Sequence, residues 1–143
     1  MPYKFLDDLT TADVAFEVTG SKLEEVFLAA AEATANTMVD CLESVARVVA
    51  RDVSLECPEL DLLLFNYLQE LIYYKDAEAL LLLPERIEIR ESEDGFALRS
   101  TLKGEEIDVA RHEQRVDVKA VTLHRFKLEK TSDGWRALVI LDV

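Results

Sequence analysis

Residues 111–143 read RHEQRVDVKAVTLHRFKLEKTSDGWRALVILDV and contain the clearest structural pattern in the chain. Apolar and polar side chains alternate over residues 116–124, which predicts a half-buried strand. The sequence TSDG at residues 131–134 predicts a tight turn, and a second strand follows it to the end of the chain. Such a hairpin would hold two negative groups in one place, the Asp142 side chain and the α-carboxylate of Val143.

Upstream of this hairpin, strand-like and helix-like periodicities follow one another. Strands are expected over residues 3–6, 14–19, 45–57, 80–90 and 96–102, and helices over residues 21–40 and 58–76. Ser21-Lys22-Leu23-Glu24 reads as a capping box, in which Glu24 would bond back to the start of the first helix. Pro84 predicts an edge strand or a bulge, because proline has no N–H to donate to a neighbouring strand.

The order of these elements predicts the fold class. Turn signals at residues 92–95 and 131–134 join pairs of strands, residues 103–110 read as a polar connection, and both helices come early in the chain. This order favours an α+β fold, with a mostly antiparallel sheet and two helices packed on one face. Because the chain has 143 residues and no linker-like segment, we expect a single domain over residues 1–143.

The chain is strongly acidic, with 29 Asp and Glu against 16 Lys and Arg and a formal net charge of −13. Repulsion from phosphate backbones argues against direct nucleic-acid binding, whereas acidic surfaces suit a basic partner protein, a bound cation or simple solvation. Cys41 and Cys57 have no metal-ligand spacing, and we expect both to be reduced in a cytoplasmic protein. No signal pattern is visible, and the longest apolar runs are shorter than the ~20 residues that cross a membrane.

Few residues suit the common catalytic motifs. Four isolated glycines exclude the phosphate-binding loops of P-loop and dinucleotide-binding proteins. His124 shares a strand face with Val118 and Phe126, so we expect it to point at the core or at a pocket beside it. His112 lies in a polar connection and is expected at the surface. No catalytic triad is predicted, because neither histidine comes with an evident nucleophile and orienting group.

The acidic residues suggest a cation site instead. Asp13 lies at the start of one predicted strand, and Asp142 and Val143 lie at the end of another. If these strands are neighbours, three anionic groups converge, and a hard cation such as Ca²⁺ would relieve their repulsion through oxygen ligands. If the strands are not neighbours, the same residues are separate solvated carboxylates.

Seven segments, in order along nearly the whole chain, resemble the archease family. They are Thr11-Ala12-Asp13, Ser21-Lys22-Leu23-Glu24-Glu25, Met38-Val39-Asp40, Leu64-Phe65-Asn66-Tyr67-Leu68-Gln69-Glu70-Leu71-Ile72, Arg111-His112-Glu113, Val118-Lys119-Ala120-Val121-Thr122-Leu123-His124 and Val139-Ile140-Leu141-Asp142-Val143. The segments at residues 111–113 and 118–124 are the most specific. The chain departs from the family's usual Asp-His-Thr-Ala-Asp motif, because residues 8–13 read DLTTAD and lack the histidine. Asn66 also stands where the family commonly has Asp.

The resemblance implies a fold of antiparallel sheet and two helices, in accord with the pattern above. It also implies a metal site, expected to hold Ca²⁺, formed by Asp13, Asp142 and Val143. The implied function is to promote guanylylation of the GTP-dependent tRNA-splicing ligase, which supports multiple turnover and broadens its nucleotide use, without being an enzyme itself. We expect Asp40, at a helix end, to extend the acidic surface that meets the ligase. The alternative functions are a chaperone-like binding module and a metal-dependent hydrolase.

Overall fold

Seven strands and two long helices occupy residues 2–6 and 13–143, the part of the chain that the computed structural model describes. In order they are β1 (Tyr3–Leu6), β2 (Val14–Gly20), α1 (Leu23–Met38), a short 3₁₀ helix η1 (Leu42–Ser44), β3 (Val49–Cys57), α2 (Leu60–Glu78), β4 (Leu80–Ser92), β5 (Gly95–Glu106), β6 (Ala120–Lys130) and β7 (Trp135–Asp142). Thr11 and Ala12 of the archease-like motif lie outside the described residues. Within the described ranges, no helix is long and apolar enough to span a membrane.

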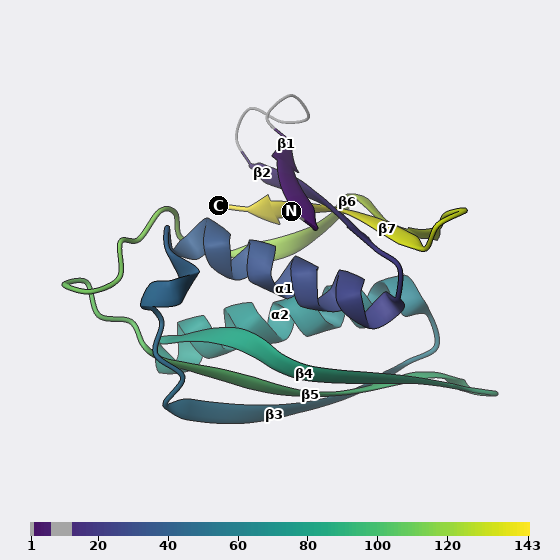
Figure 1. The fold of residues 1–143 in the computed structure, drawn as a ribbon, viewed down its shortest axis with the longest axis horizontal. Helices are drawn as coiled ribbons and strands as arrows, with labels where there is room; N and C mark the ends of the chain where they lie inside the picture. The colour runs from purple at the N-terminus through teal and green to yellow at the C-terminus, as the bar shows by residue number, and fades with distance from the viewer. Residues whose placement is uncertain (1, 7–12) are drawn as a thin grey trace.

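The strands form two antiparallel sheets, and both helices lie between them (Figure 1). The first sheet has the strand order β1-β2-β7-β6, and the second has the order β3-β5-β4. Both helices contact strands of both sheets, so each sheet has helices on one of its faces. The predicted α+β class and the antiparallel pairing are confirmed, and the division of the strands between two sheets is a further result of the structure.

One hydrophobic core joins these layers. Small side chains let α1 lie close to its neighbours, since Ala30, Ala31 and Ala33 are fully buried. From α2, Tyr67 reaches the second sheet, where its hydroxyl lies 2.8 Å from that of Ser100. Burial of apolar surface is the main favourable term in folding, so the sheets and helices stabilise one another.

The start of α1 differs by one residue from the predicted capping box. Lys22 precedes the helix, and Glu25 rather than Glu24 bonds back to its start. The Glu25 carboxylate accepts the Ser21 hydroxyl at 2.5 Å and the Lys22 backbone N–H at 3.0 Å. These two bonds lower the pKa of Glu25. The predicted glutamate-to-backbone capping bond is present, but Glu25 makes it instead of Glu24. Two adjacent glutamates allow the same motif in two registers.

β3 starts later than the strand predicted over residues 45–57. The Ala46 N–H donates to the Glu105 side chain at 2.6 Å, and regular pairing begins only at Val49, opposite Gly104. Val45 is buried all the same, so it continues the apolar alternation without belonging to the strand. The alternation of apolar residues indicates which side chains are buried, not which residues pair with another strand. For this reason the predicted start of β3 is four residues too early.

The β4–β5 hairpin confirms two predictions and corrects a third. Its turn lies at residues 92–95, and the pairing register shifts at Pro84, on an edge strand. Residues 103–106, however, belong to β5 and not to a polar connection. Gly104 permits the close approach of β4 here, because a Cβ at this position would lie 1.7 Å from the Leu81 carbonyl oxygen.

β6 also starts later than predicted. The alternation suggested a strand from Val116, whereas pairing begins at Ala120, opposite Asp142. The register then breaks after Thr122, and His124 is exposed instead of facing the core. The prediction for His124 is wrong because alternation assigns faces correctly only along an unbroken strand.

Candidate metal and partner site at the ends of β2 and β7

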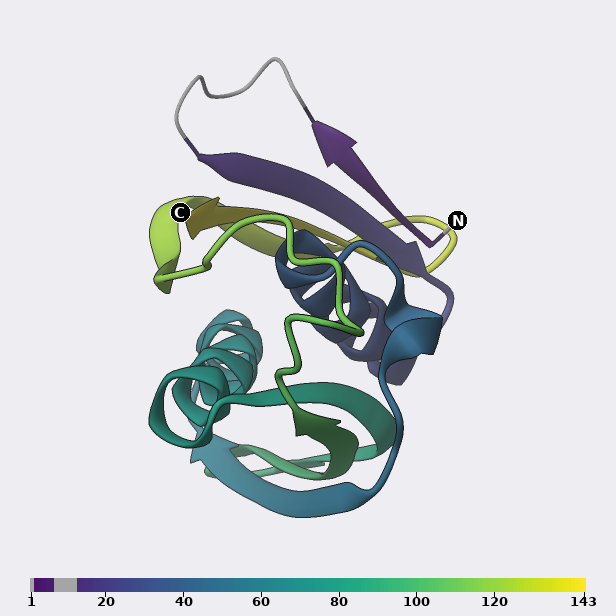
Figure 2. The same cartoon turned by 90° about the vertical axis from the view of Figure 1, so that its left-hand side faces the viewer.

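Antiparallel pairing of β2 with β7 brings the two aspartates of the predicted metal site to neighbouring strand ends. Val14 pairs with Leu141, so Asp13, immediately before Val14, comes opposite Asp142, immediately after Leu141. The start of β2 and the end of β7 lie side by side in Figure 2. The strand order that the cation hypothesis required is therefore present.

β6 borders the same place on the other side of β7. Ala120 pairs with Asp142, and the Lys119 N–H donates to the Asp142 carbonyl oxygen at 2.8 Å. The last residues of β7 are thus held between two strands. This pairing also brings Lys119 to an end of the sheet that is otherwise marked by carboxylates, a neighbour that the sequence patterns did not identify.

The donor groups at this end are all oxygens. Asp142 is exposed, while Asp13 and Val143 are half-buried, and Val143 packs against the core. Within residues 2–6 and 13–143, no three His, Cys, Asp or Glu side chains are close enough to hold a metal ion. A metal site here therefore needs the α-carboxylate of Val143 beside the two aspartates. Such a set suits Ca²⁺, which takes oxygen ligands, better than Zn²⁺, which prefers nitrogen and sulfur.

Asp40, the predicted partner-binding residue, follows the end of α1 and has an exposed side chain. Its N–H donates to the Glu113 carbonyl oxygen at 2.8 Å, and the Asn36 amide donates to the Asp40 carbonyl oxygen at 3.0 Å. These bonds fix the backbone at this point. The ends of α1 and β7 lie toward the same, left-hand side of the molecule in Figure 1.

Residues 107–119, called the 107–119 connection below, link β5 to the start of β6, and His112 anchors their first half. The imidazole is buried, its Nδ1 accepts the Asp108 N–H at 2.9 Å, and its Nε2 lies 2.9 Å from Glu105. Because a backbone N–H occupies Nδ1, the ring proton is on Nε2, which donates to the carboxylate. The prediction of a surface position for His112 is wrong, because the ring pairs with Glu105. This residue belongs to the part of β5 that was predicted to be a polar connection.

Glu105, near the end of β5, connects this strand to the chain at Ala46 and to the 107–119 connection. Its carboxylate accepts the Ala46 N–H, the Arg111 guanidinium and the His112 ring N–H. The Arg111 guanidinium, followed by the Ala46 N–H, lowers the pKa of Glu105 from its usual 4.5 to about 2. The ionised carboxylate is therefore favoured in the folded chain, where it holds the 107–119 connection against β5.

This lowered pKa predicts how stability depends on pH. Because the pKa of Glu105 is lower in the folded than in the unfolded chain, its stabilising contribution is present above pH 4.5 and is lost as the pH falls toward about 2. Urea denaturation of a Glu105→Gln variant should therefore show a flatter fall in the free energy of unfolding across that range. Glu106→Gln, at the exposed neighbouring position, should keep the wild-type slope. Equal slopes for Glu105→Gln and the wild type would contradict this role.

Lys75 anchors the second half of the 107–119 connection. Its ammonium, at the end of α2, donates to Asp117 at 2.5 Å, to the Val118 carbonyl oxygen at 2.6 Å and to Asp76 at 2.7 Å. Burial lowers the pKa of Lys75, but the bonds to Asp117 and Asp76 outweigh this effect, and the net shift is upward. Val118 is fully buried, so the chain enters β6 at a fixed point beside Asp142.

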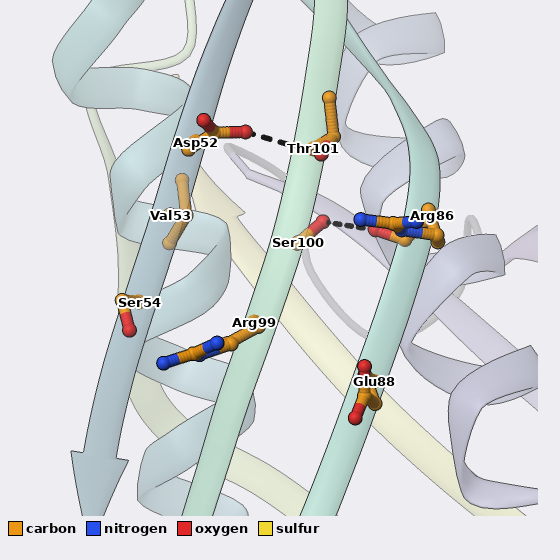
Figure 3. Close-up of a pocket in the computed structure, with 8 residues that line it drawn as sticks. All are labelled: Asp52, Val53, Ser54, Arg86, Glu88, Arg99, Ser100 and Thr101. Atoms are coloured by element: carbon orange, nitrogen blue, oxygen red, sulfur yellow. Dashed lines mark hydrogen bonds between the residues drawn. The ribbon is translucent and has the colours of Figure 1, made fainter.

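The outer face of the second sheet offers another candidate site (Figure 3). A hollow of about 430 Å³ is lined by residues of β3, β4 and β5, among them Asp52, Ser54, Arg86, Glu88, Arg99 and Thr101. Asp52 accepts the Thr101 hydroxyl at 3.1 Å. Two arginines accompany two acidic residues there, so the hollow has no excess charge that would select an ion. We therefore assign it no ligand.

These features define a small, acidic α+β protein in which Asp13 and Asp142 lie at neighbouring strand ends and a buried histidine anchors the 107–119 connection to β5. The chain belongs to the Archease protein family, whose family model matches residues 3–143. Similar proteins include the archease of Methanosarcina acetivorans, 37% identical over 99% of this chain and 95% of the relative. The archease of Archaeoglobus fulgidus is 36% identical over the whole length of both chains.

Two solved structures are also similar to this chain. The solution structure of protein 1598 from Methanobacterium thermoautotrophicum is 36% identical and covers 99% of both chains, with a TM-score of 0.85. An archease from Thermotoga maritima, described as a possible chaperone, is 22% identical, with a TM-score of 0.60 over 94% of this chain and 93% of that one. The second match supports the fold alone. The family resemblance seen in the sequence is thus confirmed.

Sequence reasoning missed the residues that position this end of the molecule. Lys75 and Asp117 form an ion pair although they are 42 positions apart in the sequence, and Glu105 accepts the N–H of Ala46, 59 positions away. One usable signal was a lysine closing the apolar pattern of α2, since a charge in a buried helix face calls for a partner.

Proposed function

We propose that this protein activates a GTP-dependent tRNA-splicing ligase by promoting its guanylylation, so that the ligase turns over repeatedly and uses a wider range of nucleotides. The observation that carries the proposal is the β2–β7 pairing, which sets Asp13 opposite Asp142 next to Val143 in a member of the Archease family. In this proposal the protein is cytoplasmic and non-catalytic, and the ligase does the chemistry.

The strand ends suit such a role electrostatically. Phosphoryl transfer depends mainly on positioning and on neutralising charge around a metal ion and a triphosphate. Asp13, Asp142 and the Val143 carboxylate would hold Ca²⁺ through their oxygens, and the ion would supply positive charge for oxygen ligands of the partner. The net charge of −13 favours approach to a cationic active-site mouth. In this proposal Asp40, two residues after the end of α1, extends the acidic surface that meets the ligase.

A guanylylation and ligation assay with the cognate ligase tests this proposal. Sub-stoichiometric amounts of the protein should raise the guanylylation rate and allow each ligase molecule to complete more than one ligation. A folded protein that leaves both quantities unchanged would contradict the proposal. Phosphoester hydrolysis by the isolated protein would instead favour the metal-dependent hydrolase.

A chaperone-like binding module is the second candidate, favoured by the description of the Thermotoga relative as a possible chaperone. This function requires apolar surface that can bind unfolded chains. On α2, however, Leu64 and Leu71 are buried and Leu60 is half-buried, so most of its apolar face is covered by the core. Suppression of the aggregation of an unrelated unfolded protein would support this alternative over the ligase activator.

A further inference from the structure

β6 carries an unusually large irregularity next to the carboxylate end of the sheet. Thr122 pairs with Ile140, and the next regular pair is Lys127 with Leu138. Residues 123–126, called the β6 bulge below, therefore stand opposite the single residue Val139. A common β-bulge has one extra residue, whereas this one has three, and bulges of this kind often re-aim side chains beside functional sites.

The β6 bulge has a backbone conformation that its residue types do not favour. Arg125 has φ of 56°, in the left-handed region that residues other than glycine seldom adopt. The Thr122 hydroxyl is buried and has no hydrogen-bond partner among the described residues. Phe126 fixes the bulge to α2 through an edge-on contact with Phe65, at 5.7 Å between ring centroids. Packing thus holds the chain in a strained form, which is typical of functional segments.

The exposed side chains of the β6 bulge combine apolar and cationic character. Leu123 is 61% exposed, and His124 and Arg125 are also exposed. Residues 118–128 contain no Asp or Glu, although the whole chain has 29. This edge of the first sheet is therefore a cationic segment on an acidic protein, and it begins beside Ala120, the partner of Asp142.

We propose that the β6 bulge is a docking contact for a partner protein, which receives Leu123 in an apolar pocket bordered by carboxylates that pair with Arg125. An exposed leucine beside a cation suits a protein surface, because a phosphate backbone offers the leucine no contact. The inference rests on the proposed function for the identity of the partner, the ligase. The acidic strand ends and the cationic bulge on one sheet would then fix the orientation of the complex. A cationic surface of the ligase attracts the strand ends and repels the bulge, and an acidic surface of the ligase does the reverse.

Affinity measurements with the cognate ligase test this inference. Leu123→Ser removes the apolar side chain, and Arg125→Gly removes the cation while keeping the left-handed backbone, which glycine adopts freely. Each variant should weaken the Kd for the ligase about tenfold or more, as expected for a central interface contact. Val109→Ser is the matched control, since Val109 is 83% exposed but lies in the 107–119 connection, and its Kd should equal that of the wild type.

Four further measurements, of thermal stability, Ca²⁺ affinity, ligase stimulation and RNA binding, separate the possible outcomes. Thermal unfolding should show that Arg125→Gly is at least as stable as the wild type, and Ca²⁺ affinity should be unchanged in both bulge variants. If the wild type binds and stimulates the ligase and both variants do so equally well, the docking contact is refuted while the proposed function stands. If the wild type neither binds nor stimulates the ligase, the docking contact and the proposed function are both contradicted. If the wild type binds RNA and Arg125→Gly alone abolishes that binding, the bulge is a nucleic-acid contact and the inference is overturned.

Discussion

An Asp142→Asn variant should bind Ca²⁺ about tenfold or more weakly and should leave the ligase at the guanylylation rate that it has alone. Asparagine keeps the shape of the side chain and one oxygen, but it removes the negative charge and one of the two oxygens that can bind the ion. Asp142 is exposed, and its side chain makes no hydrogen bond or ion pair among the described residues, so the fold should be unaffected.

The matched control for this variant is Asp133→Asn. Asp133 is an exposed aspartate in the β6–β7 turn, at the opposite end of β7. The control changes the net charge by the same amount and should keep wild-type Ca²⁺ affinity and ligase stimulation. If Asp142→Asn stimulates guanylylation as well as the control does, the strand-end carboxylates are not required for activation of the ligase.

Replacing Gly104 with Ala should destabilise the fold by about 3 kcal/mol, because the added methyl group cannot be accommodated. Its Cβ would lie 1.7 Å from the Leu81 carbonyl oxygen, and backbone on both strands would have to move. The midpoint of thermal unfolding should fall by roughly 10 °C for a chain of this size. Chemical and thermal denaturation followed by circular dichroism would measure both quantities.

Gly20→Ala is the control for this prediction. At Gly20 an added Cβ would lie 3.0 Å from the Cβ of Glu25 and 3.2 Å from the backbone nitrogen of Val26, so a shift of only a few tenths of an ångström at the start of α1 relieves the contacts. The loss of stability should therefore be clearly smaller than at Gly104. Equal losses at the two positions would show that β4 and β5 are not packed as closely at Gly104 as the structure indicates.

The features that could be predicted from the sequence depend on local chemistry. Glycine after Asp gave both hairpin turns, and Pro84 gave the register shift on an edge strand. The ends of strands were harder to predict, because distant partners determine them. The strand predicted from residue 45 starts at Val49, since the Ala46 N–H binds Glu105, a residue 59 positions away in sequence.

The candidate site was predictable in part. Placing Asp13 and Asp142 together required the assumption that their strands are neighbours, and the β2–β7 pairing confirms it. The two histidines show the limit of pattern analysis. His112 seemed polar and exposed but is buried against Glu105, and His124 seemed to face inward but is exposed by the β6 bulge. The error for His112 follows from the missed end of β5, where Glu105 lies, and the error for His124 follows from the break in the β6 register.

The most direct test of this account is a Ca²⁺ titration of the wild-type protein followed by amide NMR spectra. If Asp13, Asp142 and the Val143 carboxylate hold the ion together, one saturable site should shift the amide signals of Val14, Lys119 and Asp142. The expected affinity lies in the range of about 10⁻⁶ to 10⁻³ M, and for Asp142→Asn the same shifts should require about tenfold or more higher Ca²⁺ concentrations. Unchanged signals at millimolar Ca²⁺, or shifts confined to the second sheet, would contradict the proposed metal site.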